Sequence, residues 1–160
     1  MNNKRVLLTQ KGSERLTLEL KQLKSVDRPA VIAAIAEARA QGDLSENAEY
    51  DAARERQGFI EGRIQYLEAI LSTAEIVTPN EEQAGGRVVF GATVTVEDLN
   101  TEKQERYQIV GEDESDISRN LISIQAPIAR ALIGKEAGDV VEFKVPQGQR
   151  ELEIVSVEYV

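Results

Sequence analysis

The spacing of the apolar residues changes near residue 78, and this change limits the folds open to the chain. Before it, Leu16, Leu20 and Leu23 recur at steps of four and three residues, as on one face of a helix. After it, stretches such as "RVVFGATVTVEDL" are β-branched and alternate between apolar and polar. We therefore predict an α+β fold, with a helical domain over 1–78 and a β domain over 79–160.

The helical half should form two arms. Thr9 or Ser13 can cap the start of the first arm. Pro29 should interrupt this arm, and Asp27 would then be the N-cap of the helix that begins again after it. Gly42 stands where a left-handed helix stop is expected. The stripe of the first arm continues through Val31, Ile35 and Ala38, and that of the second arm comprises Ala48, Ala52, Phe59, Ile60, Ile64, Leu67, Leu71 and Ala74. Stripes this narrow predict an antiparallel coiled-coil hairpin whose tip is the stretch GDLSEN.

The pattern of the second half predicts a compact, mostly antiparallel β domain of about five strands. Turn residues separate its alternating stretches, which are "RVVFGATVTVEDL", "ERYQIVG", "LISIQ", "DVVEFKV" and "RELEIVSVEYV". The segment "PIARALIGK" (127–135) predicts one short helix, because Pro is tolerated at a helix start and Gly follows a helix end.

Composition excludes several kinds of chemistry. The chain has 160 residues and neither cysteine nor histidine, so disulfides, zinc thiolates and the usual imidazole base are ruled out. Net charge is −9, but residues 1–79 carry 11 basic and 12 acidic side chains whereas residues 80–160 carry 8 and 16. The first half is therefore less repelled by nucleic acid than the second. No apolar run is long enough for a membrane span or a signal peptide, so we expect a cytoplasmic protein.

The stretch "GDLSENAEY" (42–50) is acidic and lies where the two arms should turn. Asp43 and Glu46 have the D-x-x-E spacing of a capping box, which would make them structural. Alternatively, their carboxylates could hold Mg²⁺, which prefers oxygen ligands and takes only one or two of them from protein. An exposed tip has no pocket of its own, so such carboxylates would complete a partner's two-metal phosphoryl-transfer site.

Arg39 and Arg54 flank this stretch and could approach each other across the hairpin. Together they could make bidentate contacts to an RNA or DNA phosphate. Alternatively, the two arginines form ion pairs along the hairpin with Glu37, Asp51 or Glu55.

These stretches resemble a known family. "RPAVIAAIAEARAQGDLSENAEYDAARERQGFIEGRI" (28–64) is similar to the coiled-coil tip of the GreA/GreB family of bacterial transcript cleavage factors. "GRVVFGATVTVEDL", "NLISIQAPIARALIGK" and "EIVSVEYV" resemble its C-terminal domain, so the resemblance covers essentially the whole chain. The near-neutral first half favours the GreA branch.

The resemblance implies a monomer with an FKBP-like C-terminal domain, partnered by the bacterial RNA polymerase elongation complex. The hairpin would enter the polymerase secondary channel and stimulate Mg²⁺-dependent removal of the 3′ end of backtracked RNA, without being an enzyme alone. The implied metal-holding and catalytic pair is Asp43 and Glu46, donated to the polymerase. The implied nucleic-acid contacts are Arg39 and Arg54; the tip scaffold is Gly42, Asn47, Glu49 and Tyr50; the polymerase-docking residues are Pro127 and Ile128.

Two positions depart from the family pattern. Ser45 stands where lysine is common, and Ala126 stands where many relatives have serine. Three other readings stay open: a channel binder of the same fold that does not stimulate cleavage, a prolyl-isomerase-like or chaperone domain, and a plain coiled-coil adaptor. The intact Asp43 and Glu46 argue against the first, and the scarcity of aromatic residues in the second half argues against the second.

Overall fold

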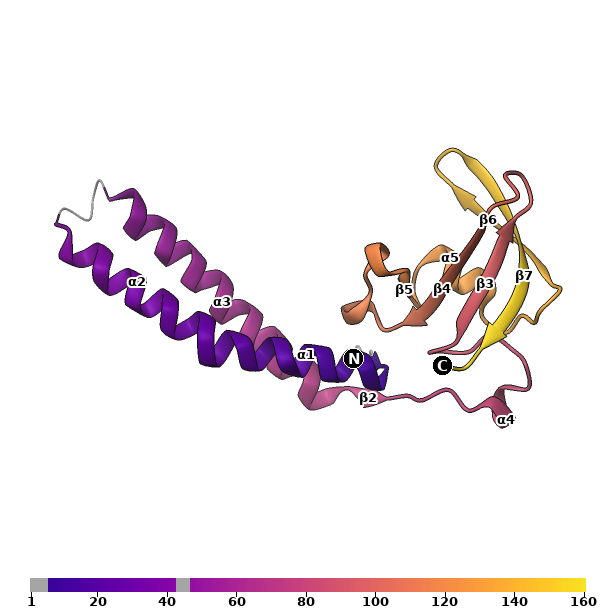
Figure 1. The fold of residues 1–160 in the computed structure, drawn as a ribbon, viewed down its shortest axis with the longest axis horizontal. Coiled ribbons are helices and arrows are strands. Elements are labelled where there is room, and N and C mark those ends of the chain that lie inside the picture. The colour runs from indigo at the N-terminus through magenta and orange to yellow at the C-terminus, as the bar shows by residue number, and fades with distance from the viewer. Residues whose placement is uncertain (1–5, 43–46) are drawn as a thin grey trace, which may run out of the picture. The chain divides into compact units, whose positions relative to one another are not determined.

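The computed structural model describes residues 6–42 and 47–160 (Figure 1). Its contacts divide the chain into a helical unit, Ser13–Ala74, and a sheet unit that combines residues up to Gly12 with Glu75–Val160. The α+β class is confirmed, and the predicted boundary between residues 78 and 79 stays a prediction. Within the described residues, every helix is too short or too polar to span a bilayer.

The first arm of the hairpin begins with α1 (Gln10–Gln22), passes through a π-helical turn, η1 (Leu23–Asp27), and continues as α2 (Arg28–Ala40). The hydroxyl of Thr9 accepts a hydrogen bond of 3.0 Å from the backbone N–H of Gly12. Thr9 therefore caps α1, which confirms one of the two expected caps.

The π-helical turn compensates for an irregular spacing of the buried residues. Leu16 and Leu23 are seven residues apart, Leu23 and Val31 are eight apart, and Val31 and Ala38 are again seven apart. A regular helix would rotate Val31 away from the partner arm, because a seven-residue repeat matches two turns. One wider turn absorbs the extra residue and keeps the buried stripe on one side.

The predicted cap at Asp27 is wrong. Asp27 has helical dihedral angles and its side chain makes no capping hydrogen bond, so the helix does not restart there. The N–H of Arg28 instead donates to the carbonyl of Leu23, five residues earlier. Pro29, which has no N–H to donate, follows directly in the first turn of α2, so the proline widens the helix locally and does not end it.

The second arm is one helix, α3 (Ala48–Thr73). Its buried residues are Ala53, Ile60, Ile64, Leu67 and Ile70. The expected positions Ile60, Ile64 and Leu67 are confirmed. The prediction was wrong for Ala48, Ala52 and Phe59, which are exposed and lie outside the seam; the side chain of Phe59 is 72% exposed. The seam keeps a seven-residue repeat back to Ala53, so the predicted stripe was one residue out of phase near the tip.

Charged side chains flank the seam and join the two arms. Arg28 donates two hydrogen bonds to Glu61, at 2.9 and 2.7 Å, and Arg63 donates two to Glu19, at 2.7 and 3.0 Å. Because these pairs are part-exposed, each adds about 0–1 kcal/mol to stability. Their main effect is to favour one register of the two arms.

The sheet unit holds a five-stranded sheet in the order β5-β4-β3-β7-β6. Its strands are β3 (Thr93–Asp98), β4 (Gln104–Val110), β5 (Leu121–Ser123), β6 (Val140–Val145) and β7 (Gly148–Glu158). All neighbours are antiparallel except β4 and β5, which confirms the prediction of a mostly antiparallel domain and adds one parallel pair to it. The turns η3 (Glu112–Glu114) and η4 (Ile117–Arg119) make the long connection that a parallel pair requires.

One short helix, α5 (Pro127–Leu132), packs on this sheet and confirms the helix expected near 127–135. Ala129 and Leu132 are fully buried in one core with residues of β3, β4, β6 and β7. Outside the large sheet, β1 (Leu7–Leu8) pairs in parallel with β2 (Glu75–Ile76), and α4 is a single turn, Glu81–Ala84.

A buried carboxylate fastens the N-terminal segment to the sheet unit. Glu114 is 3% exposed and accepts hydrogen bonds from the backbone N–H of Thr9 at 2.7 Å, from the Thr9 hydroxyl, and from the N–H of Gly111 at 3.3 Å. A Cβ at Gly12 would overlap the Glu114 carboxylate, and one at Gly111 would overlap the backbone carbonyl of Leu7. Both glycines are therefore required by close approach.

We expect Gly111→Ala to lower the free energy of unfolding of the sheet unit by about 1–3 kcal/mol, because a backbone carbonyl cannot easily move aside. Gly62→Ala is the control, since Gly62 lies in α3 with open space around it and should gain about 0.5–1 kcal/mol. Urea denaturation followed by circular dichroism measures both. Equal effects of the same sign would contradict the packing described for Gly111.

Candidate functional site at the hairpin tip

The end of α2 and the start of α3 form the tip. The described residues that the sequence assigned to it are Arg39, Gly42, Asn47, Glu49, Tyr50 and Arg54. Asp43 and Glu46, the predicted metal-holding pair, lie outside the described residues, as does the departure at Ser45.

Gly42 ends the first arm as expected. Its φ is +114°, in the region where only glycine avoids strain, and its N–H points to the carbonyl of Arg39 at 3.4 Å. The positive φ directs the chain out of α2 and into the acidic stretch.

Asn47 joins the ends of the two helices. Its Oδ1 accepts from the backbone N–H of Tyr50 at 3.1 Å, which makes it the N-cap of α3. Its Nδ2 donates to the carbonyl of Ala38 in the last turn of α2, at 2.8 Å. One amide therefore satisfies an unpaired N–H of one helix and a carbonyl of the other. Asn47 was expected in the scaffold, but its capping role was not predicted. The capping box considered as one alternative, Asp43 with Glu46, lies outside the described residues.

Acidic residues follow the cap. Glu49 and Asp51 lie exposed in the first turn of α3, where the helix dipole favours negative charge. This placement accounts for both carboxylates without a ligand.

Tyr50 brings the two predicted arginines together. The guanidinium carbons of Arg39 and Arg54 each lie 5.9 Å from the centre of its ring, within the range of a cation–π contact. Arg54 also donates to the Tyr50 hydroxyl at 3.2 Å. Hydrogen bonding from Arg39, and then from Arg54, holds the pKa of Tyr50 below its ordinary value, because both cations favour the phenolate.

The tip arginines differ from those farther down the hairpin. Arg28 and Arg63 are paired with carboxylates. Among the described residues, Arg39 and Arg54 form no ion pair with any carboxylate. The pairs considered with Glu37, Asp51 or Glu55 are therefore not formed. Both arginines contact Tyr50 instead. No carboxylate in the described part of the chain neutralises them, which is compatible with the phosphate-contact hypothesis.

The predicted docking residues start α5. Pro127 is exposed in its first turn, whereas Ile128 is half-buried and packs partly against the sheet core. Ala126 precedes them as the N-cap and offers no side-chain hydrogen bond. A contact made here with another protein would therefore be mainly apolar.

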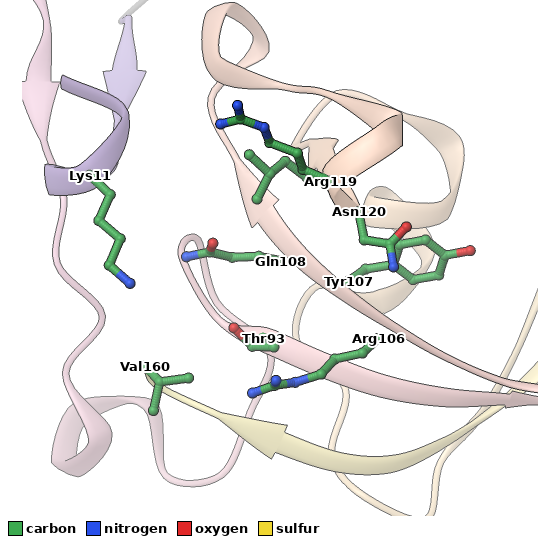
Figure 2. A pocket seen from close by; sticks show the side chains of 9 residues that line it. Lys11, Thr93, Arg106, Tyr107, Gln108, Arg119, Asn120 and Val160 are labelled. Carbon is green, nitrogen blue, oxygen red and sulfur yellow. The ribbon is translucent and has the colours of Figure 1, made fainter. Parts of the chain in front are cut away.

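The sheet unit also carries a basic hollow of about 390 Å³ (Figure 2). Lys11, Arg106 and Arg119 line it, and no carboxylate side chain does. Arg106 contacts Glu158 at 3.4 Å and Arg119 contacts Asp116 at 3.7 Å, so these two arginines are partly neutralised. The lining suits no metal ion, and no cluster of three or more potential metal-ligating side chains occurs in the part of the chain that the structure describes.

Comparison with known sequences decides the family. The model described as "Transcription elongation factor, N-terminal" matches residues 6–76, and that described as "Transcription elongation factor, GreA/GreB, C-term" matches residues 73–159. The chain belongs to the GreA/GreB family. The resemblance that the tip and the C-terminal stretches carried is thereby confirmed.

Individual relatives agree with this assignment. The chain is 61% identical to transcription elongation factor GreA of Neisseria meningitidis serogroup A over 156 residues, covering 98% of this chain and 99% of that one. It is 59% identical to GreA of Verminephrobacter eiseniae, covering 95% and 96%. The crystal structure of GreA factor homolog 1 of Thermus thermophilus is 30% identical and covers 97% of this chain and 99% of that one, with a TM-score of 0.43, too low to add to the assignment.

We expect Asn47→Ala to lower the stability of the hairpin by about 1–2 kcal/mol, because it removes the cap of α3 and the bond to α2 together. Asn47→Asp keeps the acceptor for the Tyr50 N–H and loses only the donor to Ala38, so its loss should be smaller. Hydrogen exchange of the α3 amides measures both. Unchanged exchange in Asn47→Ala would contradict a bridging role.

Proposed function

We propose that the protein rescues backtracked bacterial RNA polymerase by inserting its hairpin into the secondary channel and stimulating cleavage of the RNA 3′ end. Its family makes it a transcription elongation factor that stimulates cleavage by the polymerase and does not cleave RNA alone. The observation that carries the proposal is the tip, where two arginines without carboxylate partners among the described residues flank the acidic stretch.

Asp43 and Glu46 are the proposed catalytic contribution. Their donor set, two carboxylates, fits Mg²⁺ shared with the polymerase active centre. Asp43 and Glu46 would hold Mg²⁺ there, and the ion would supply a water of lowered pKa and charge stabilisation for the leaving oxygen in phosphoryl transfer. The carboxylates supply negative charge and hydrogen-bond acceptors that orient this water. Two carboxylates alone are too few for tight binding, so the metal joins them only in the complex.

Arg39 and Arg54 are proposed to contact the phosphate backbone of the extruded RNA. Guanidinium groups bind phosphate oxygens through paired N–H donors, which fixes position without reading sequence. Such contacts would hold the scissile linkage against the tip while the polymerase cleaves it.

The sheet unit is proposed to dock on the polymerase at the outer rim of the channel, with Pro127 and Ile128 in the contact. Residues 80–160 carry 8 basic and 16 acidic side chains, which favours a protein partner over nucleic acid for this half. The protein would act as a monomer, in the bacterial cytoplasm where transcription takes place.

The direct test uses a backtracked elongation complex with end-labelled RNA and Mg²⁺. The intact protein should shorten the RNA, and Asp43→Asn with Glu46→Gln should slow this by roughly a hundredfold or more, the scale of several kcal/mol of lost transition-state stabilisation. The control is Glu37→Gln with Glu55→Gln, which removes the same charge from two exposed positions near the tip.

The control variant should cleave at nearly the rate of the intact protein. Equal rates for all three proteins would leave Asp43 and Glu46 as structural caps. Binding without cleavage by the intact protein would identify a relative that occupies the channel and does not stimulate the reaction.

A further inference from the structure

We propose that Tyr50 is a positioning residue, whose ring and hydroxyl hold the guanidinium groups of Arg39 and Arg54 together for the RNA phosphate. This inference rests on the proposed function and adds a role to a residue that the sequence assigned only to the scaffold.

The contacts around Tyr50 connect two helices. Arg39 belongs to the last turn of α2 and Arg54 to the second turn of α3, yet both guanidinium carbons lie 5.9 Å from the same ring centre. Without an intermediary, two like charges repel each other and drift apart. The electron-rich face and the phenol oxygen of Tyr50 offset this repulsion.

The backbone that carries the ring is held in place. The N–H of Tyr50 donates to Asn47, and the same Asn47 side chain donates to the carbonyl of Ala38, the neighbour of Arg39. A short network therefore runs from the backbone of α2 through Asn47 to Tyr50. It fixes the backbone of Tyr50 relative to that of Arg39.

Tyrosine, unlike a carboxylate, does not neutralise the arginines that it contacts. A carboxylate in its place would hold the guanidinium groups equally well, as Glu61 holds Arg28 and Glu19 holds Arg63. It would also neutralise them and compete with phosphate. A neutral aromatic partner restricts the arginine rotamers before binding and leaves N–H donors for the anion, which lowers the entropy lost on binding.

Cleavage rates at saturating protein test the role. Tyr50→Leu removes ring and hydroxyl, and we expect it to slow saturated cleavage by roughly three- to thirtyfold, the range of cation–π contacts. Tyr50→Phe keeps the ring and loses only the hydrogen bonds to the hydroxyl, so its loss should be smaller. Arg56→Gln, at an exposed arginine on the same helix, is the control and should leave the rate unchanged.

A cycle of variants separates positioning from scaffolding. Once Arg39→Gln and Arg54→Gln are both present, Tyr50→Leu should cause no further loss of rate, because nothing is left to position. An equal loss with and without the arginines would overturn the proposal and leave Tyr50 as a structural residue. Normal cleavage by the double arginine variant would overturn it as well.

Tyrosine titration of the free protein tests the contact without polymerase. Absorbance of the phenolate, taken as the difference between the intact protein and Tyr50→Phe, should show a pKa for Tyr50 below that of an ordinary tyrosine. Arg39→Gln should raise it most, and Arg54→Gln should raise it less. An ordinary pKa that neither variant moves would overturn the proposal. If the titration shows the contact but the intact protein does not stimulate cleavage, the proposed function is wrong and the contact between Tyr50 and the arginines still stands.

Discussion

The seven-residue seam between the two arms determines what the hairpin can present at its end. Ala53, Ile60 and Leu67 of α3 keep this repeat without interruption, whereas the first arm carries one residue too many between Leu23 and Val31. The π-helical turn η1 absorbs that residue, so both arms stay in phase up to the tip. Because of this alignment, two arginines fifteen residues apart meet one tyrosine ring.

At the tip, different polar groups have different structural roles. Asn47 satisfies the backbone, Tyr50 holds the arginines, and Glu49 and Asp51 lie where the helix dipole favours them. Each of these roles uses groups other than Asp43 and Glu46. Because Asn47 supplies the N-cap of α3, that cap depends on neither carboxylate.

The sequence alone was enough for the α+β class, the two helical arms, the caps at Thr9 and Gly42 and the short helix at Pro127, because each depends on local spacing or turn chemistry. It missed the π-helical turn and the phase of α3 near Ala53, since small residues on either side of the seam look alike. It also missed the parallel pairing of β5 with β4, which depends on how the intervening turns fold. The buried Glu114 was missed because its contact with Thr9 joins residues 105 positions apart. At the tip the sequence did not predict that Asn47 caps α3, because the side-chain bond to Ala38 depends on how the two arms pack.

The proposed role of the tip is to donate carboxylates to a metal site that the polymerase completes. The most direct measurement is the Mg²⁺ dependence of RNA cleavage in a backtracked complex, with and without saturating protein. We expect the intact protein to lower the Mg²⁺ concentration for half-maximal cleavage. The variant with Asp43→Asn and Glu46→Gln should still bind but should not lower that concentration. The same shift in both proteins would contradict the claim.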